Sequence, residues 1–90
     1  MKIKDIIIRG IEKNDSDLKT SNKSFSYISD DDAFYSYNEK IAYMCRDTNA
    51  MFIYGLTAKY KNFFSNTTSK HFSKILNVCN EKEIDNQILF

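Results

Sequence analysis

The chain contains no proline and no tryptophan, and glycine occurs only at Gly10 and Gly55. Because Pro- and Gly-rich stretches usually separate domains, their absence predicts that residues 1–90 form a single domain. The sequence also lacks a long apolar run and a charged-then-apolar leader, so no membrane segment and no export signal are predicted. The expected location is therefore the cytoplasm.

Cysteine and histidine are also scarce, with Cys45, Cys79 and His71 as the only examples. Neither cysteine lies in a metal-binding spacing, so no metal site is expected and both thiols are predicted to be reduced and buried. The run from Asp30 to Asp32 lacks the spaced ligands of a calcium loop and is typical of a solvated acidic turn. No glycine-rich phosphate loop is present, and no cofactor is predicted.

An active site of the nucleophilic type needs a nucleophile, a base and an orienting group that converge. The chain contains the residue types for such a site, namely Cys45 or Cys79, His71 and an aspartate. However, no nucleophile lies in a recognisable elbow motif, and a set of this kind arises by chance in many short chains. The sequence therefore predicts a protein that is not an enzyme.

Charge is distributed unevenly along the chain, although the formal net charge is only +1. Residues 12–39 carry seven acids against three lysines, whereas residues 48–80 contain no acid and four lysines. Such an asymmetry can steer a partner or orient a self-complementary homodimer. The alternative is that the two segments neutralise each other within the fold.

Apolar periodicity predicts a helix over residues 1–13, a polar loop over 14–23 and a sheet over 24–65. The strands expected in this sheet are 24–29, 33–38, 40–46 and 51–55, followed by a last strand at 62–65. Residues 56–61 form either a loop or one helical turn before it. The short gaps favour an antiparallel meander of three or four strands.

A second helix is predicted over residues 66–80, followed by a tail at 81–90. Four of its apolar positions recur at i, i+3, i+4 and i+7 and are expected to be buried: Phe72, Ile75, Leu76 and Cys79. The tail is apolar enough to pack back on the domain or to meet another chain. Together these patterns predict an α+β fold in which both helices cover one face of the sheet.

The start of the second helix, FFSNTTSKHFSKIL, carries no acidic residue, although helix N-termini favour acids. Asn66 or Thr67 is expected to cap the helix. Ser65, Thr68 and His71 are expected to fix the corner between the preceding strand and this helix. In this interpretation the hydroxyl groups serve the helix rather than a ligand.

Lysines near this corner predict a partner-binding surface. Lys70 opposes the helix dipole and lies one turn from Lys74, and both conflicts would be relieved by an acidic partner. Cations and aromatic rings alternate in the preceding segment, a mixture that proteins binding single-stranded nucleic acid also use. The predicted binding residues are Lys59, Tyr60, Lys61, Phe63, Lys70 and Lys74.

The segments SYNEKIAYM, MFIYG and FFSNTTSKHFSKIL resemble a small domain of unknown function found in bacteriophage and mobile-element proteins. In that domain a Ser-Tyr-Asn strand leads to an Ile-Ala strand, and a short strand ends in a Ser-x-Thr-Thr-Ser-x-His helix start. The matching positions are Ser36, Tyr37, Asn38, Ile41, Ala42, Ser65, Thr67, Thr68, Ser69 and His71. The resemblance covers residues 36–76, and the stretch LTAKYKN departs from it.

This resemblance implies an origin in a phage or prophage. Small phage proteins without catalytic residues commonly bind and block host machinery, and the anti-CRISPR proteins are one such group. The implied function is inhibition of a host protein, such as a Cas protein or another defence nuclease, by masking or locking it. The alternative is an accessory protein that binds single-stranded nucleic acid through Lys59, Lys61, Lys70 and Lys74.

Overall fold

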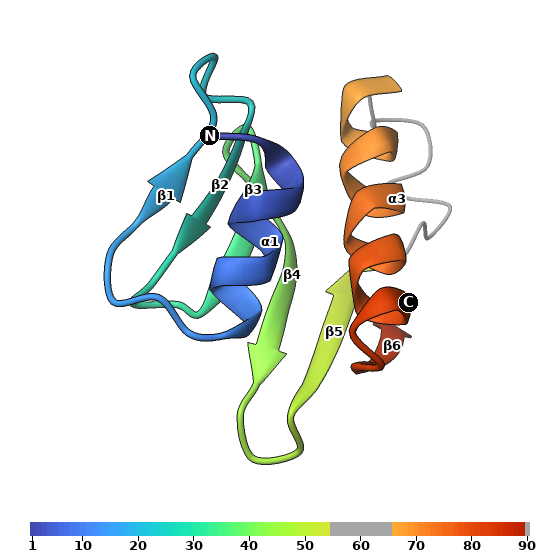
Figure 1. Cartoon of the computed structure of the whole chain (residues 1–90). Coiled ribbons are helices and arrows are strands. Elements are labelled where there is room, and N and C mark those ends of the chain that lie inside the picture. The colour runs from blue at the N-terminus through green and yellow to red at the C-terminus, as the bar shows by residue number, and fades with distance from the viewer. Residues whose placement is uncertain (55–65, 90) are drawn as a thin grey trace.

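The computed structural model describes residues 1–54 and 66–89, with only the backbone described for residues 66–68. This part of the chain has an α+β fold of two helices and a six-stranded sheet (Figure 1). The elements in chain order are α1 (Ile3–Ile11), β1 (Leu18–Lys19), β2 (Phe25–Ile28), β3 (Ala33–Ser36), β4 (Glu39–Cys45), β5 (Ala50–Tyr54), α3 (Asn66–Glu81) and β6 (Asp85–Leu89).

The sheet follows the order of the chain from β1 to β6. Neighbouring strands from β1 to β5 are antiparallel, whereas β5 and β6 are parallel. The connection between β5 and β6 includes α3, because a parallel pair needs a long crossover. The sheet is therefore mixed, and the predicted meander matches its central strands only.

Two strands lie in segments for which the sequence predicted none. β1 falls inside the expected loop at 14–23 and pairs with β2 through Leu18–Tyr27 and Lys19–Ser26. β6 occupies the expected tail and pairs with β5 along its length. Both strands depend on a neighbouring edge that local sequence patterns do not reveal, which explains why the predicted strand count was too low.

The core lies between the helices and one face of the sheet. β2 contributes Phe25 and Tyr27, and β5 contributes Met51 and Ile53, all at most 1 % exposed. Ile6 and Ile7 of α1 and several residues of α3 belong to the same cluster, so both helices cover the same sheet face (Figure 1). The register pairs Tyr27 with Phe34 and so continues this face into β3.

The buried stripe of α3 follows the predicted helical spacing. Phe72, Ile75 and Cys79 are buried, while Leu76 is only partly buried and packs at the margin of the core. Val78, one helical turn after Ile75, is also buried and was not among the predicted positions. This stripe determines which side chains of α3 face solvent.

Gly10 allows α1 to lie close to the sheet. A Cβ atom at this position would be 2.5 Å from Cζ of Phe34 and 2.8 Å from Cδ1 of Tyr27. Both distances are far below an ordinary contact between carbon atoms. The absence of a side chain at Gly10 therefore sets the distance between α1 and strands β2 and β3.

Candidate binding face

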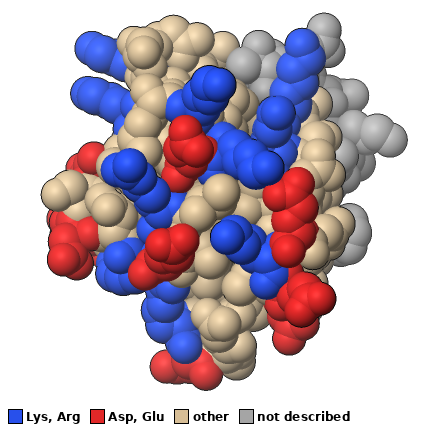
Figure 2. All heavy atoms as spheres, in the orientation of Figure 1, with Lys and Arg blue, Asp and Glu red and all other residues tan. Residues whose placement is uncertain are grey.

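Lys70 and Lys74 lie on the solvent side of α3. Because Phe72 and Ile75 point into the core, the opposite side of the helix faces solvent, and both lysines are exposed. They are one turn apart, as the sequence predicted. Figure 2 shows several Lys and Arg side chains over the upper part of this view, with an acidic side chain among them.

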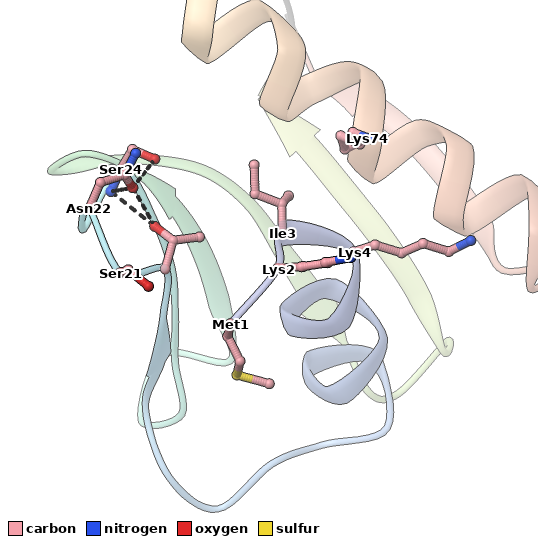
Figure 3. Close-up of a pocket in the computed structure, with 9 residues that line it drawn as sticks. Met1, Lys2, Ile3, Lys4, Ser21, Asn22, Ser24 and Lys74 are labelled. Carbon is pink, nitrogen blue, oxygen red and sulfur yellow. Dashed lines mark hydrogen bonds between the residues drawn. The ribbon is translucent and has the colours of Figure 1, made fainter.

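A hollow of about 560 Å³ joins Lys74 to the start of α1 and to the turn between β1 and β2 (Figure 3). It brings together residues that are far apart in the sequence. Its lining consists of Met1, Lys2, Ile3, Lys4, Thr20, Ser21, Asn22, Ser24 and Lys74. The lining includes three lysines and no acidic residue. We call Lys2, Lys4, Lys70 and Lys74 the basic face.

The turn that borders the hollow is held by its own hydrogen bonds. The Oδ1 atom of Asn22 accepts from the Thr20 hydroxyl at 2.9 Å, from the Ser24 hydroxyl at 2.8 Å and from the Ser24 backbone N–H at 3.1 Å. Oγ1 of Thr20 in turn accepts from the backbone N–H groups of Ser24 and Phe25. The side-chain acceptor oxygens of Asn22 and Thr20 are thus engaged within the turn.

The start of α1 has no side-chain cap. Lys2 occupies the N-cap position with φ −81° and ψ 150°, the extended geometry of a capping residue, but makes no side-chain cap hydrogen bond. A lysine side chain has donors only and cannot accept from the free N–H groups of the first turn. The backbone N–H groups at the N-terminal end of α1 therefore place partial positive charge beside the hollow, and Asp5 in the first turn offsets part of it.

Lys4 links the two helices. Its ammonium group lies 3.2 Å from the carboxylate of Glu81, and both side chains are more than half exposed. In Figure 3 the Lys4 side chain extends from α1 toward α3. An exposed pair of this kind contributes little to stability. It does, however, pair the positive charge of Lys4 with a carboxylate.

His71 ties the first turns of α3 to the sheet. Its Nδ1 atom lies 2.7 Å from Oγ of Ser36 in β3, and both residues are 1 % exposed. The imidazole also packs against the ring of Phe25, with the ring centroids 5.0 Å apart. Burial lowers the pKa of His71, so this histidine is neutral near pH 7. The hydrogen-bond partner of His71 is therefore a side chain of the sheet.

The C-terminal end of α1 is held by Arg46, which follows β4. Its guanidinium donates to the backbone oxygens of Gly10 at 2.7 Å and Ile11 at 2.6 Å. It also donates to both carboxylate oxygens of Asp32, at 2.6 and 2.8 Å, while the Tyr27 hydroxyl donates to Asp32 at 2.6 Å. The prediction of a solvated acidic turn is therefore wrong for Asp32, whose carboxylate is partly buried in a bonded network.

The pKa values in this network follow from its geometry. Burial alone would raise the pKa of Asp32, but the hydrogen bonds from Arg46 and Tyr27 outweigh it and lower the pKa below its ordinary value. Burial, followed by the hydrogen bond to Asp32, raises the pKa of Tyr27 to about 12. Asp32 is therefore ionised and Tyr27 is protonated near pH 7.

The sheet face opposite the helices carries aromatic side chains on β4 and β5. The rings of Tyr43 and Phe52 are stacked with centroids 5.4 Å apart, and Tyr54 lies 5.9 Å from Tyr43. The ammonium group of Lys40 lies 5.9 Å from the centre of the Tyr43 ring. We call these four residues the aromatic face.

The cysteines occupy different environments. Cys79 is buried, as predicted, and burial raises the pKa of its thiol to about 11. Cys45 is only partly buried, contrary to the prediction, and hydrogen bonds from Thr48 lower the pKa of its thiol. In the described residues, no three His, Cys, Asp or Glu side chains come together as a metal site.

Only part of the predicted binding surface lies within the described residues. Lys59, Tyr60, Lys61, Phe63 and Ser65 lie outside the described residues, as do the side chains of residues 66–68. Of the remaining predicted residues, Lys70 and Lys74 are exposed and His71 is buried. Sequence reasoning missed Lys2 and Lys4, although lysines around an uncapped helix start were visible as a signal.

A family model described as a family of unknown function (DUF8033) matches residues 6–90. No curated protein and no solved structure matches the chain. The resemblance to a small uncharacterised domain is thus supported, whereas the phage origin stays a prediction. Among the described residues, neither helix has the length and apolar character needed to cross a membrane.

Proposed function

The chain belongs to the DUF8033 family of unknown function, and we propose that it is a non-catalytic binding protein whose basic face engages an acidic patch on a partner protein. One observation carries this proposal: lysines from both helices gather around a hollow that has no acidic residue in its lining. Complementary charge of this kind accelerates encounter and selects the partner. The buried Ser36–His71 pair has a structural role in this proposal, because a substrate has no access to it.

Inhibition of a host defence protein is the specific form of this function that the resemblance to phage domains implies. Nucleases that use metal ions hold them with clustered carboxylates. A face of lysines is complementary to such a cluster and could mask it without any chemistry of its own. A Cas protein or another defence nuclease is therefore the partner class we propose.

Binding of single-stranded nucleic acid is the second candidate, and the aromatic face favours it. Stacked rings with an adjacent cation suit unpaired bases. Tyr43, Phe52 and Tyr54 lie on the sheet face opposite the helices, whereas Lys70 and Lys74 lie on α3. Because the two candidates use opposite faces, separate variants can distinguish them.

The test of the protein-binding proposal is charge reversal by Lys70→Glu with Lys74→Glu. The matched control reverses two exposed lysines outside the basic face, Lys19→Glu with Lys82→Glu. Tagged proteins, shown to be folded by circular dichroism, would be used to capture partners from a bacterial host lysate treated with nuclease. We expect the first variant to lose the captured protein and the control to retain it. Equal capture by both variants would contradict the proposal.

Salt dependence separates the two candidates further. Each lysine that contacts a single-stranded nucleic-acid backbone adds about −0.7 to the slope of log affinity against log salt. A protein interface with an apolar centre and a charged rim should lose affinity more gradually. The Tyr43→Ala variant provides the complementary test, since it should weaken binding of an oligonucleotide and leave capture of a protein unchanged.

A further inference from the structure

We infer that the hollow between the start of α1, the β1–β2 turn and α3 is a binding pocket for a small phosphomonoester. This inference goes beyond the proposed protein partner, because it concerns a small ligand inside the hollow. The pocket shares Lys2, Lys4 and Lys74 with the basic face (Figure 3). The charge, the hydrogen-bonding groups and the size of the hollow each favour such a ligand.

The charge of the lining calls for a dianion. Within the described residues, the ion pairs are Lys4–Glu81 and Arg46–Asp32, so the ammonium groups of Lys2 and Lys74 have no acidic partner. No lining residue is acidic. A phosphomonoester carries a charge of about −1.5 to −2 near pH 7 and would match these two cations, whereas a carboxylate or a sulfonate supplies only one negative charge.

The hydrogen-bonding groups of the lining point to an acceptor ligand. Asn22 uses its side-chain oxygen for three donors within the turn, which leaves its amide N–H groups as the part able to bind a ligand. Ser21 adds an exposed hydroxyl, and the lysines have donors only. Phosphate oxygens are strong acceptors and suit such a lining. The uncapped start of α1 strengthens this preference for an acceptor ligand but is not the basis for it.

The size of the hollow favours an ester over free phosphate. Its volume of about 560 Å³ lies in the range of small-molecule sites and exceeds what one phosphate ion fills. Met1 and Ile3 give it an apolar wall beside the lysines. A ring or a short chain attached to the phosphate would cover this wall, so we expect phenyl phosphate to bind more tightly than inorganic phosphate.

The test is titration of the full chain with phenyl phosphate by isothermal calorimetry at constant ionic strength. Benzenesulfonate serves as a control ligand with the same ring and a single charge. We expect saturable binding of phenyl phosphate and roughly tenfold weaker binding of benzenesulfonate. Failure of phenyl phosphate to saturate the protein, or equal affinity for the two ligands, would overturn the inference.

Variants locate the ligand. Lys2→Gln and Lys74→Gln should each weaken phenyl phosphate binding roughly tenfold, whereas Lys82→Gln, outside the hollow, should leave it unchanged. Glu81→Gln should strengthen binding, because it removes an acid and releases Lys4 from its ion pair. All four positions are exposed, so the variants should remain folded, which circular dichroism would verify. Unchanged affinity in Lys74→Gln would exclude this pocket.

The phenyl phosphate titration and the partner-capture test can succeed or fail independently of each other. If phenyl phosphate does not bind but reversal of Lys70 and Lys74 abolishes partner capture, the pocket inference falls and the basic-face proposal stands. If phenyl phosphate binds and the reversed variant still captures its partner, the pocket inference stands and the basic-face proposal falls.

Discussion

The two ends of α1 differ in how their polar groups are satisfied. At the C-terminal end, Arg46 donates to the backbone oxygens of Gly10 and Ile11 and is itself held by Asp32. At the N-terminal end, Lys2 makes no side-chain cap hydrogen bond, and a hollow lined by lysines opens beside it. One end is closed by the protein, whereas the other leaves donors and charges for a ligand.

This difference separates stability from binding within a single helix. Polar groups that form their hydrogen bonds inside the fold hold α1 in place but are not free to bind a partner. Groups without internal partners add little to stability but can bind an anion. We therefore expect substitutions near the C-terminal end of α1 to change stability, and substitutions near its N-terminal end to change binding.

The largest expected effect is that of Gly10→Ala. The added methyl group would overlap the buried rings of Phe34 and Tyr27, which cannot move without disturbing the core. Overpacking of this kind should lower the free energy of unfolding by about 3 kcal/mol, even though alanine favours the helix. Urea denaturation would measure the change, with Arg9→Ala at the exposed neighbouring position as control. A stable variant would mean that α1 can move away from the sheet.

Loss of the Arg46 network should have the next largest effect. Arg46→Gln removes the guanidinium donor from Asp32 and from two backbone oxygens. The expected cost is about 2 kcal/mol, because the network is only partly buried and Asp32 and the Gly10 oxygen keep hydrogen bonds from Tyr27 and Lys13. Asp32→Asn should cost less, since the amide can still accept a hydrogen bond. Equal stability of Arg46→Gln and the wild type in urea denaturation at pH 7 would contradict the conclusion that Arg46 holds the C-terminal end of α1.

The same network predicts a pH dependence. The pKa of Asp32 is lower in the folded protein than its ordinary value of 3.8. The contribution of Asp32 is therefore fully present above pH 3.8 and is lost as the pH falls through the lowered folded pKa. Urea midpoints between pH 2 and pH 7 should show this acid loss in the wild type and a smaller loss in Asp32→Asn. Parallel curves would assign the acid sensitivity to other groups.

His71 extends the comparison to α3, whose first turns are tied to the sheet by a buried hydrogen bond. His71→Gln should lower the free energy of unfolding by about 1 to 2 kcal/mol at pH 8, because Ser36 loses its imidazole partner. Burial lowers the pKa of His71 below 6.5, so its contribution is present above pH 6.5 and is lost as the pH falls through the folded pKa. The two proteins should therefore converge in stability toward acid pH, and a constant difference would exclude titration of His71.

The smallest expected effect on stability has the opposite sign. Lys2→Ser places a capping hydroxyl at a residue that already has N-cap geometry, and should raise the free energy of unfolding by about 0.5 to 1 kcal/mol. The same change removes a cation from the hollow and should weaken phenyl phosphate binding. Thermal denaturation and calorimetry on one sample would measure both quantities. A gain in stability without a loss in binding would show that Lys2 does not contact the ligand.

Local sequence patterns determined much of the framework. The spacing of apolar residues predicted α1 and α3, because a helix repeats every 3.6 residues and one of its sides must be buried. Alternation and short gaps predicted the central strands from β2 to β5, since tight turns allow antiparallel neighbours only. The outward position of Lys70 and Lys74 follows from the same helical period. These features depend on residues that are close together in the chain.

Tertiary structure alone decided the remaining features, because they depend on contacts between distant segments. β6 forms where α3 returns the chain to the exposed edge of β5, and no local pattern in residues 85–89 reveals that edge. Arg46 reaches Gly10 and Asp32 only after β4 has packed beside β3. Lys2 and Lys74 are far apart in the sequence and share a hollow because both helices cover the same face of the sheet.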